Sequence, residues 1–341
     1  MDLSGFLNVI KPAGPTSHDL VVEVRRLLPG IKVGHLGTLD PLAAGVLPLA
    51  LGSATRLADY AHHHRKTYRA EFLLGVETES GDLDGEVVAT APEGLVVPVA
   101  EVWSSLRQFT GEILQRPPVS SAIRIAGRRS YERARAGEAV EPPARKVAVY
   151  RWQWLATWRR DGTLQDGPLA DESTCSSTAP LAAGDRLLFE IECSAGTYVR
   201  ALARDLGRAL GLRATLSYLL RTRVGPFSIA DAVSPAELAS LLKRGEGLKE
   251  RAAVLAEAGL IKPARFIWPA QLPRLVIPET LLPRLRNGQT ILQEAAVDAV
   301  RSAGSQAGEA TEVLIETEAG QAVAIGIFCG PGRFRARRML V

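Results

Sequence analysis

The chain of 341 residues has few residues that could form disulfides or bind metal: three cysteines and five histidines. Cys175, Cys193 and Cys329 are scattered without a Cys-x-x-Cys pair. Three of the histidines are consecutive, at positions 62–64, and consecutive side chains cannot face the same way on a helix. The sequence therefore predicts neither a disulfide framework nor a metal site, and this cysteine usage is typical of a reducing cytosol.

Long apolar runs and nucleotide-binding motifs are also missing. No apolar run reaches the roughly 18 residues that a membrane helix needs. The N-terminus lacks the charged start and apolar core of a signal peptide. There is no Walker loop and no dinucleotide fingerprint. We expect a cytoplasmic protein with no membrane partner.

What is present is an ordinary globular composition with clustered arginines. Hydrophobic residues make up 46% and charged residues 23%, enough for one large domain and a small one. The net charge is only +4, but residues 116–135 and 196–226 carry six arginines each against one acid. Four more arginines lie between residues 333 and 338. Planar guanidinium groups suit phosphate, so these clusters favour a nucleic-acid partner. The alternative is an arginine-rich surface that is only solvated.

The most informative stretch is residues 33–57, in which Asp40 is the only acid. Pro41 biases Asp40 toward an extended or turn conformation, and the apolar residues 42–51 predict a buried element behind it. A carboxylate on a stiff loop against a wall that excludes water is typical of a catalytic site. A plain Asp-Pro turn between two core elements would look the same.

The stretch GHLGTLDPLAAGVLP, residues 34–48, resembles the signature of the TruB family of tRNA pseudouridine synthases. Further blocks occur in the order found in the family, and together they cover roughly residues 6–225: residues 8–18, 66–69, 82–85, 117–122, 127–131 and 193–200. The resemblance implies an α+β pseudouridine synthase fold, with a mixed, mostly antiparallel sheet and flanking helices. It also implies a small C-terminal β domain of the PUA type.

The activity implied by the resemblance is the isomerisation of uridine-55 in the T loop of tRNA to pseudouridine. The N1–C1′ bond breaks, the base turns over, and C5 joins the sugar; nothing is oxidised or added, so no cofactor is expected. Asp40 would be the catalytic carboxylate, as a nucleophile or as a base. A dry pocket favours a protonated carboxyl group, and Arg200 beside Asp40 would favour the ionised form. Tyr68 would lie against the uracil.

The resemblance also assigns substrate-binding positions. His35, between Gly34 and Gly37, would fill the stack that the extruded uridine leaves, although a lone histidine is more often structural. Without the resemblance, Tyr68 would be an ordinary strand residue and Arg200 a surface phosphate contact. The remaining binding candidates are Lys11, Asp82, Arg128, Arg129, Tyr198, Leu219 and Arg221.

We divide the chain into a catalytic domain over residues 1–265 and a PUA-like RNA-binding domain over residues 272–341. Residues 115–146, rich in proline and arginine, would form an arm that grips the T stem-loop, or else a flexible loop. Residues 162–183 read as a flexible loop longer than is usual in the family. We expect a monomer that needs no protein partner. Two other interpretations are a guide-dependent synthase subunit and a non-catalytic RNA chaperone; the arm argues against the first and the intact Asp40 against the second.

Periodicity and capping residues predict the principal elements. We expect strands over residues 6–12, 68–76, 147–158, 186–193 and 217–225. Helices are expected over residues 18–28 with Ser17 as N-cap, 54–60, 99–109 and 197–210. On the last helix, Arg200, Arg204 and Arg208 recur every four residues on one face.

Overall fold

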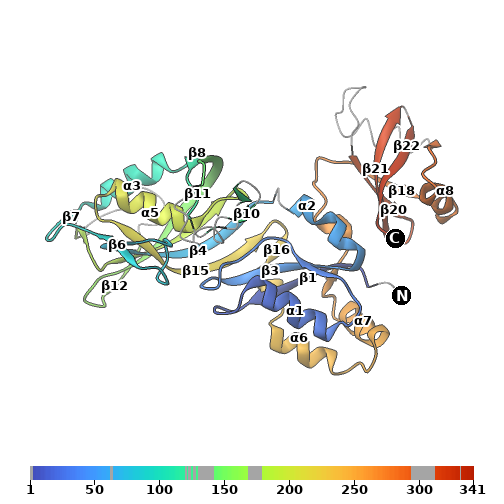
Figure 1. Cartoon of the computed structure of the whole chain (residues 1–341), viewed down its shortest axis with the longest axis horizontal. Helices are drawn as coiled ribbons and strands as arrows, with labels where there is room; N and C mark the ends of the chain where they lie inside the picture. Colours follow the sequence, from blue (N-terminus) through green and yellow to red (C-terminus); the bar gives the residue numbers. More distant parts are fainter. Residues whose placement is uncertain are drawn as a thin grey trace.

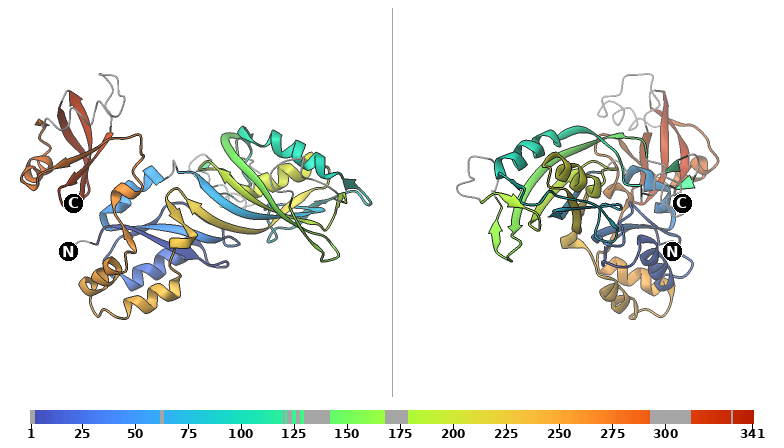
Figure 2. Two further views of the ribbon diagram at one scale, coloured as in Figure 1. Left: turned by 180° about the vertical axis from the view of Figure 1, so that it is seen from behind. Right: turned by 60° about the vertical axis from the view of Figure 1, so that its left-hand side comes forward.

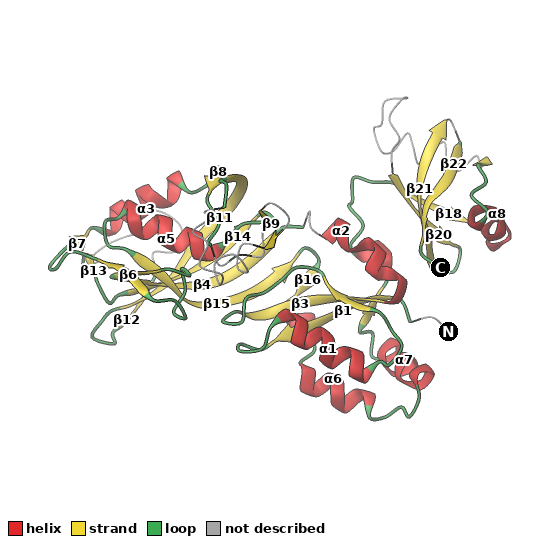
Figure 3. Cartoon of the chain, viewed as in Figure 1, coloured by secondary structure: helices red, strands yellow, loops and turns green. Residues whose placement is uncertain are grey.

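The computed structural model describes residues 3–61, 64–119, 121, 124–125, 128–129, 142–167, 179–292, 312–330 and 332–341. One large sheet, strongly curved, runs through the main body (Figure 1). Its strands follow the order β12-β11-β14-β4-β15-β3-β1-β17, and β16, β2 and β8 pair at the side of this path. Among the described strands of this sheet, only β15 and β3 pair in parallel. The predicted α+β fold with a mixed, mostly antiparallel sheet is confirmed (Figure 3).

The strands of this sheet are β1 (Gly5–Lys11), β2 (Val33–His35), β3 (Ala44–Leu51), β4 (Lys66–Leu74), β8 (Gly111–Gln115), β11 (Arg145–Trp158), β12 (Leu164–Asp166), β14 (Arg186–Cys193), β15 (Ala214–Val224), β16 (Phe227–Ser228) and β17 (Ile261–Lys262). Three two-stranded ribbons accompany it: β5 (Val76–Thr78) with β6 (Val87–Thr90), β7 (Val96–Val97) with β13 (Leu181–Ala182), and β9 (Arg124–Ile125) with β10 (Arg128–Arg129).

Two groups of helices cover different parts of the sheet (Figure 2). The first group is α1 (Ser17–Leu27), α6 (Pro235–Leu242) and α7 (Leu248–Glu257), which share an apolar cluster with β1 and β3. The second is α3 (Val99–Gln108) and α5 (Val199–Ala209), which pack on aromatic side chains of β4, β11 and β14. The short helix α2 (Ala58–Ala61) follows the 3-10 turn η1 (Gly52–Leu57) directly. Two more 3-10 turns are η3 (Ile229–Asp231), between β16 and α6, and η4 (Ala264–Phe266), between β17 and β18 (Arg274–Ile277).

The start of α1 corrects one prediction and ties the helix to the Asp40 loop. Thr16, not Ser17, is the N-cap: its hydroxyl accepts from the Asp19 amide at 3.1 Å, and the Asp19 carboxylate accepts from the Thr16 amide at 2.8 Å. The Ser17 hydroxyl instead bonds both backbone groups of Leu39, at 2.8 and 2.9 Å. Two adjacent hydroxyl residues both fit a cap, and a contact distant in sequence decides between them.

Two further predictions need correction. The helix expected over residues 54–60 is a 3-10 turn followed by one turn of α2. Of the predicted flexible loop over residues 162–183, the described ends form β12, which extends the large sheet, and β13. Residues 168–178 of this loop lie outside the described residues.

The predicted small C-terminal β domain is present as a sheet in the order β18-β20-β21-β22-β19. Its elements are β18 (Arg274–Ile277), η5 (Glu279–Leu281), α8 (Leu282–Arg286), β19 (Ile291–Leu292), β20 (Glu312–Thr317), β21 (Ala322–Gly330) and β22 (Arg333–Met339). Leu314, Ile325 and Leu340 of this domain belong to the same buried cluster as Phe6 and Val46 of the large sheet. The two parts therefore share an apolar core.

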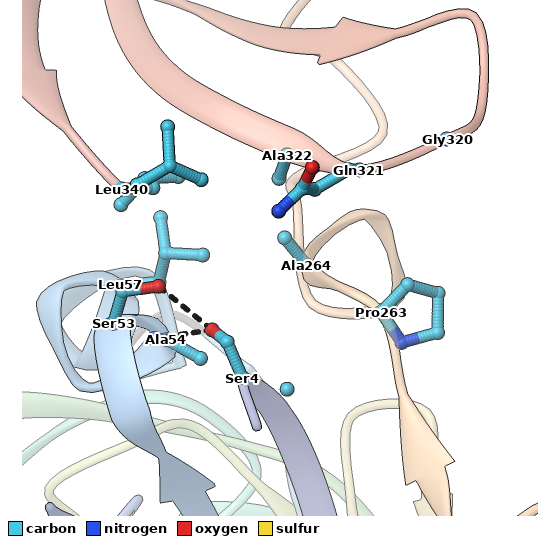
Figure 4. A pocket seen from close by; sticks show the side chains of 12 residues that line it. Ser4, Ser53, Ala54, Leu57, Pro263, Ala264, Gly320, Gln321, Ala322 and Leu340 are labelled. Carbon is cyan, nitrogen blue, oxygen red and sulfur yellow. Dashed lines mark hydrogen bonds between the residues drawn. The ribbon is translucent and has the colours of Figure 1, made fainter. Parts of the chain in front are cut away.

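Polar contacts and a small cavity complete this seam. The Tyr60 hydroxyl donates to Glu312 at 2.6 Å, and Glu312 also pairs with Arg337. Beside these contacts is a cavity of about 210 Å3 (Figure 4), in which Ser4 and Ser53 share a hydrogen bond of 2.8 Å. No lining side chain of the cavity carries a charge, so it offers no chemistry comparable to that around Asp40.

Candidate active site

Asp40 lies in the loop between β2 and β3, and its side chain is 37% exposed. It lines a pocket of about 230 Å3 whose walls come from elements far apart in the sequence. Six residues singled out from the sequence meet there: Asp40, Tyr68, Tyr198, Arg200, Leu219 and Arg221. The pocket opens where the parallel pairing of β3 and β15 brings the Asp40 loop against β4 and the start of α5.

Arg200 joins two carboxylates beneath this pocket. Its Nη2 lies 2.9 Å from Asp40 Oδ2 and its Nη1 lies 3.4 Å from Asp82 Oδ2. Nη1 also donates to the Ser80 carbonyl at 2.9 Å. Arg200 is only 4% exposed and Asp82 6%, so both charges are held away from solvent. In this arrangement Asp40 lines the pocket, and Asp82, which does not line it, holds the opposite nitrogen of the guanidinium.

The turn that carries Asp82 is built for close approach to Arg200. The Ser80 hydroxyl donates to Asp82 Oδ1 at 2.5 Å, and the Asp84 amide donates to the same oxygen at 3.2 Å. Gly81 has a positive φ of 76°, and a Cβ there would lie 3.3 Å from Arg200 Cβ. The geometry therefore requires glycine at this position.

Lys11 holds the Asp40 loop from the side away from the pocket. Its fully buried ammonium donates to the carbonyls of Ala43 at 2.7 Å, Pro12 at 2.8 Å and Pro41 at 3.2 Å. Burial lowers the pKa of Lys11 to about 8, and Asp40 opposes that change. Lys11 positions the loop and does not line the pocket.

Arg221 and Tyr68 lie opposite each other on β15 and β4. The buried guanidinium of Arg221 donates to the carbonyls of Val46, Gly37 and Thr38, at 2.8, 3.0 and 3.2 Å, and bonds the Tyr68 hydroxyl. Burial raises the pKa of Tyr68 to about 12, so its phenol is protonated at neutral pH.

Tyr198 and Leu219 form two further walls. The amide group of Gln115 bonds both backbone groups of Tyr198, at 2.8 and 3.1 Å, and the Arg145 guanidinium lies 5.0 Å from the centre of the Tyr198 ring. Leu219 is 6% exposed and faces the pocket from β15. A flat apolar group could lie between Leu219 and Tyr68.

Of the five other candidates, His35, Lys11 and Asp82 are described and do not line the pocket. His35 is in β2, half-buried and paired with Leu49. Lys11 and Asp82 lie behind residues that do line it. Arg128 and Arg129 form β10, and their side chains lie outside the described residues, as does most of the predicted arm.

The arginine-rich segment over residues 196–226 is for the most part not the phosphate surface that its charge indicates. Besides Arg200 and Arg221, Arg204 pairs with Asp205 at 2.8 Å, and Arg208 and Arg213 both pair with the buried Glu77. Five of the six arginines therefore bind groups within the chain. The sequence could not show this, because Glu77 is more than 130 residues away from its partners.

Sequence reasoning missed Lys66, Ser17 and Gln115 as parts of the site. Lys66 lines the pocket and is 8% exposed. The available signal was its place two residues before Tyr68 on one strand, which puts both side chains on the same face. Ser17 and Gln115 act through backbone contacts that have no local pattern.

Within the part of the chain that the structure describes, no group of three or more His, Cys, Asp or Glu residues could hold a metal ion. No helix among those residues is long and apolar enough to cross a membrane.

Comparison with solved structures defines the fold. The structure of an archaeal box H/ACA sRNP Nop10-Cbf5 complex is matched over 99% of this chain and 86% of that chain, with a TM-score of 0.63 and 23% identity. A Cbf5-Nop10-Gar1 complex is matched over 99% and 85%, with a TM-score of 0.62 and 24% identity. A sequence model described as "TruB family pseudouridylate synthase (N terminal domain)" matches residues 25–199, and one described as "tRNA pseudouridylate synthase B C-terminal domain" matches residues 200–270. The fold and the family match are those of a pseudouridine synthase.

Curated relatives narrow this class. The tRNA pseudouridine synthase B of Moorella thermoacetica is 43% identical over 84% of this chain and 83% of its own. That of Halalkalibacterium halodurans is 37% identical over 86% of both chains. The chain belongs to the TruB family of pseudouridylate synthases, as the sequence blocks around Asp40 predict, and it is an isomerase.

Proposed function

We propose that this enzyme converts uridine-55 in the T loop of tRNA to pseudouridine, without a cofactor and without a guide RNA. The observation that carries the proposal is the ion pair between Asp40 and Arg200 at the floor of a pocket walled by Tyr68 and Leu219. The relatives named tRNA pseudouridine synthase B support tRNA as the substrate.

Asp40 is the group that acts at the sugar. Attack on C1′ and removal of a sugar proton both need an ionised carboxylate, and Arg200 at 2.9 Å favours that form. The guanidinium of Arg200 is fixed in position, because Asp82 and the Ser80 carbonyl bind Nη1, the nitrogen that does not contact Asp40. Asp82 thus acts through Arg200 as a positioning residue. Its burial behind the guanidinium supports this positioning role for Asp82, which the sequence offers only as a substrate-binding candidate.

The base lies between Tyr68 and Leu219 while it is free of the sugar. Both side chains are nearly buried, so water is kept from the activated sugar. Arg221 fixes the Tyr68 hydroxyl and the Gly37 and Thr38 carbonyls at once, which sets the distance between the base and the Asp40 loop.

A uridine inside the folded tRNA elbow has to leave its stack before it can enter this pocket, at a cost of a few kcal/mol. His35 fills the gap that it leaves. Arg128 and Arg129, in the arm over residues 115–146, bind the phosphates of the T stem. Binding of this kind releases counterions, so salt weakens it steeply.

The test compares the wild-type chain, Asp40→Asn and the control Asp84→Asn on a T stem-loop RNA with no guide added. Asp84 is exposed on the neighbouring turn. We expect pseudouridine from the wild type and the control, and unchanged RNA affinity but no product from Asp40→Asn. Product from Asp40→Asn at a rate near that of the wild type would remove Asp40 from its role. Conversion that needed an added guide RNA would favour the guide-dependent interpretation.

A further inference from the structure

Lys66 is a buried cation that the chemistry described above does not use. It is the first residue of β4, it is 8% exposed, and it lines the same pocket as Asp40. Its ammonium makes no hydrogen bond and no ion pair with any described residue. Lys11, the other buried lysine near the loop, differs in donating to three carbonyls.

The surroundings of Lys66 leave its charge uncompensated. Four cationic side chains line the pocket, and one acid does: Lys66, Arg145, Arg200 and Arg221 against Asp40. Asp40 is already paired with Arg200. A methyl group placed on Gly37 would lie 3.7 Å from both Lys66 Cε and Arg221 Nη1, so the two cations converge under the same loop.

This arrangement is unfavourable for the folded chain by itself. A charged group that leaves water without a partner destabilises the protein. Burial, and secondly Arg221, lower the pKa of Lys66 to about 8. The only neighbour acting the other way is the buried thiol of Cys193, which is itself uncharged because burial raises its pKa to about 12. A negative charge that forms in the pocket during the reaction would supply the missing partner.

The position on the strand indicates where this negative charge forms. Lys66 and Tyr68 alternate onto one face of β4, about 7 Å apart along the strand. Tyr68 and Leu219 bound the space for the base, and Lys66 lines the same pocket next to Tyr68, so a ring placed there has the ammonium as a neighbour. Arg145 is only partly buried and stands over Tyr198, which is the position for a phosphate nearer solvent.

We propose that Lys66 is a catalytic residue. Its ammonium binds a ring oxygen of uracil and stabilises the negative charge that develops on this oxygen when the N1–C1′ bond breaks. The electron pair of that bond leaves with the ring. The electron pair that C1′ loses is replaced in one of two ways. Either the Asp40 carboxylate forms a bond to C1′, or a sugar proton is lost to the Asp40 carboxylate. As C5 joins C1′, the bond from C1′ to Asp40 breaks, or Asp40 returns the proton that it took from the sugar. The C5 proton is then lost to a base and N1 ends protonated, so the product is an isomer of the substrate. This inference rests on the proposed function.

The test uses the full chain as wild type, Lys66→Met, Lys66→Arg and the exposed control Lys243→Met. Single-turnover conversion of the T stem-loop RNA, the Kd for that RNA and the thermal unfolding temperature are measured for each. We expect Lys66→Met to lower the rate about 100-fold, as loss of one oxyanion donor does. We expect its Kd to stay within about threefold of the wild type, because the charge arises only as the bond breaks. Lys66→Arg should recover part of the rate, and Lys243→Met should match the wild type.

Stability separates this role from a structural one. Lys66→Met removes an unpaired buried charge, so its unfolding temperature should equal or exceed that of the wild type while its rate falls. A rate within threefold of the wild type would overturn the proposal. So would a loss that is equal in rate and in Kd, or a loss accompanied by a lower unfolding temperature. If the wild type itself forms no pseudouridine, the proposed function fails, and this inference with it.

Discussion

Replacing Arg200 by methionine should cost more in stability than any exposed ion pair could, because the main cost falls on Asp82. Asp82 is 6% exposed and loses in this variant the one cationic partner that it has among the described residues. Breaking a buried pair from one side costs about 3–5 kcal/mol. The Asp40 side chain is 37% exposed, so its share is screened and adds less than about 1 kcal/mol.

We expect the thermal unfolding temperature to fall by roughly 10 °C. In a chain of about this length, a loss of about 1 kcal/mol in unfolding free energy lowers that temperature by roughly 2–4 °C. Pseudouridine formation should be lost as well. The matched control is Arg204→Met, one turn further along α5. Arg204 and Asp205 are both only half-buried, so loss of their ion pair should change the unfolding temperature by no more than about 2–3 °C.

A second substitution identifies the cause. Adding Asp82→Asn to Arg200→Met removes the stranded charge, so the double variant should regain about 2 kcal/mol or more of the lost stability. It should not regain activity, because Asp40 still lacks its guanidinium. If Arg200→Met unfolds within 2 °C of the wild type, or if the double variant is no more stable than Arg200→Met, the account of Asp82 is wrong.

Three further predictions concern the loop, the second buried lysine and the arm. Lys11→Met should lower the unfolding free energy by about 3 kcal/mol, measured by urea denaturation, because the carbonyls of Pro12, Pro41 and the buried Ala43 lose a charged donor. Lys66→Met should be more stable than the wild type by about 3 kcal/mol at pH 7. That difference should fade between pH about 8 and about 10.5, because the folded wild type prefers the neutral amine and takes up a proton on unfolding in that window; a difference independent of pH would contradict it. Joining residues 119 and 142 by a short linker, which keeps Gln115 on Tyr198, should weaken RNA binding at least tenfold in a filter-binding assay and leave the unfolding temperature unchanged. Unchanged affinity would refute the arm.

The sequence predicts best the elements whose pattern is local. The alternation over residues 186–193 gives β14 to the residue, and the amphipathic spacing over residues 197–210 gives α5 to within two residues at the start and one at the end. The N-cap of α1 is wrong because Ser17 is taken by Leu39, 22 residues away. Local rules cannot choose between Thr16 and Ser17 without that contact.

The residues of the site also fall into those with a local sequence pattern and those without one. Asp40 is recognisable because its loop is a long contiguous block, whereas its partner Arg200 is 160 residues further on and enters only through the family resemblance. Lys66 lies two residues before the strand that the sequence predicts over residues 68–76, and a lysine in such a place is usually solvated. Its burial becomes visible only when Gly37 and Arg221 are folded over it.

The shared cluster at the seam between the two sheets has a practical consequence. Leu314, Ile325 and Leu340 pack in one buried cluster with Phe6 and Val46. Each of the two sheets would therefore expose apolar side chains if the other were removed. A fragment that ends before β18 would expose an apolar patch to water and would tend to aggregate on expression. For the same reason, calorimetry of the intact chain should show a single cooperative melting peak, and a graft of this C-terminal part onto another enzyme would need a matching surface to receive it.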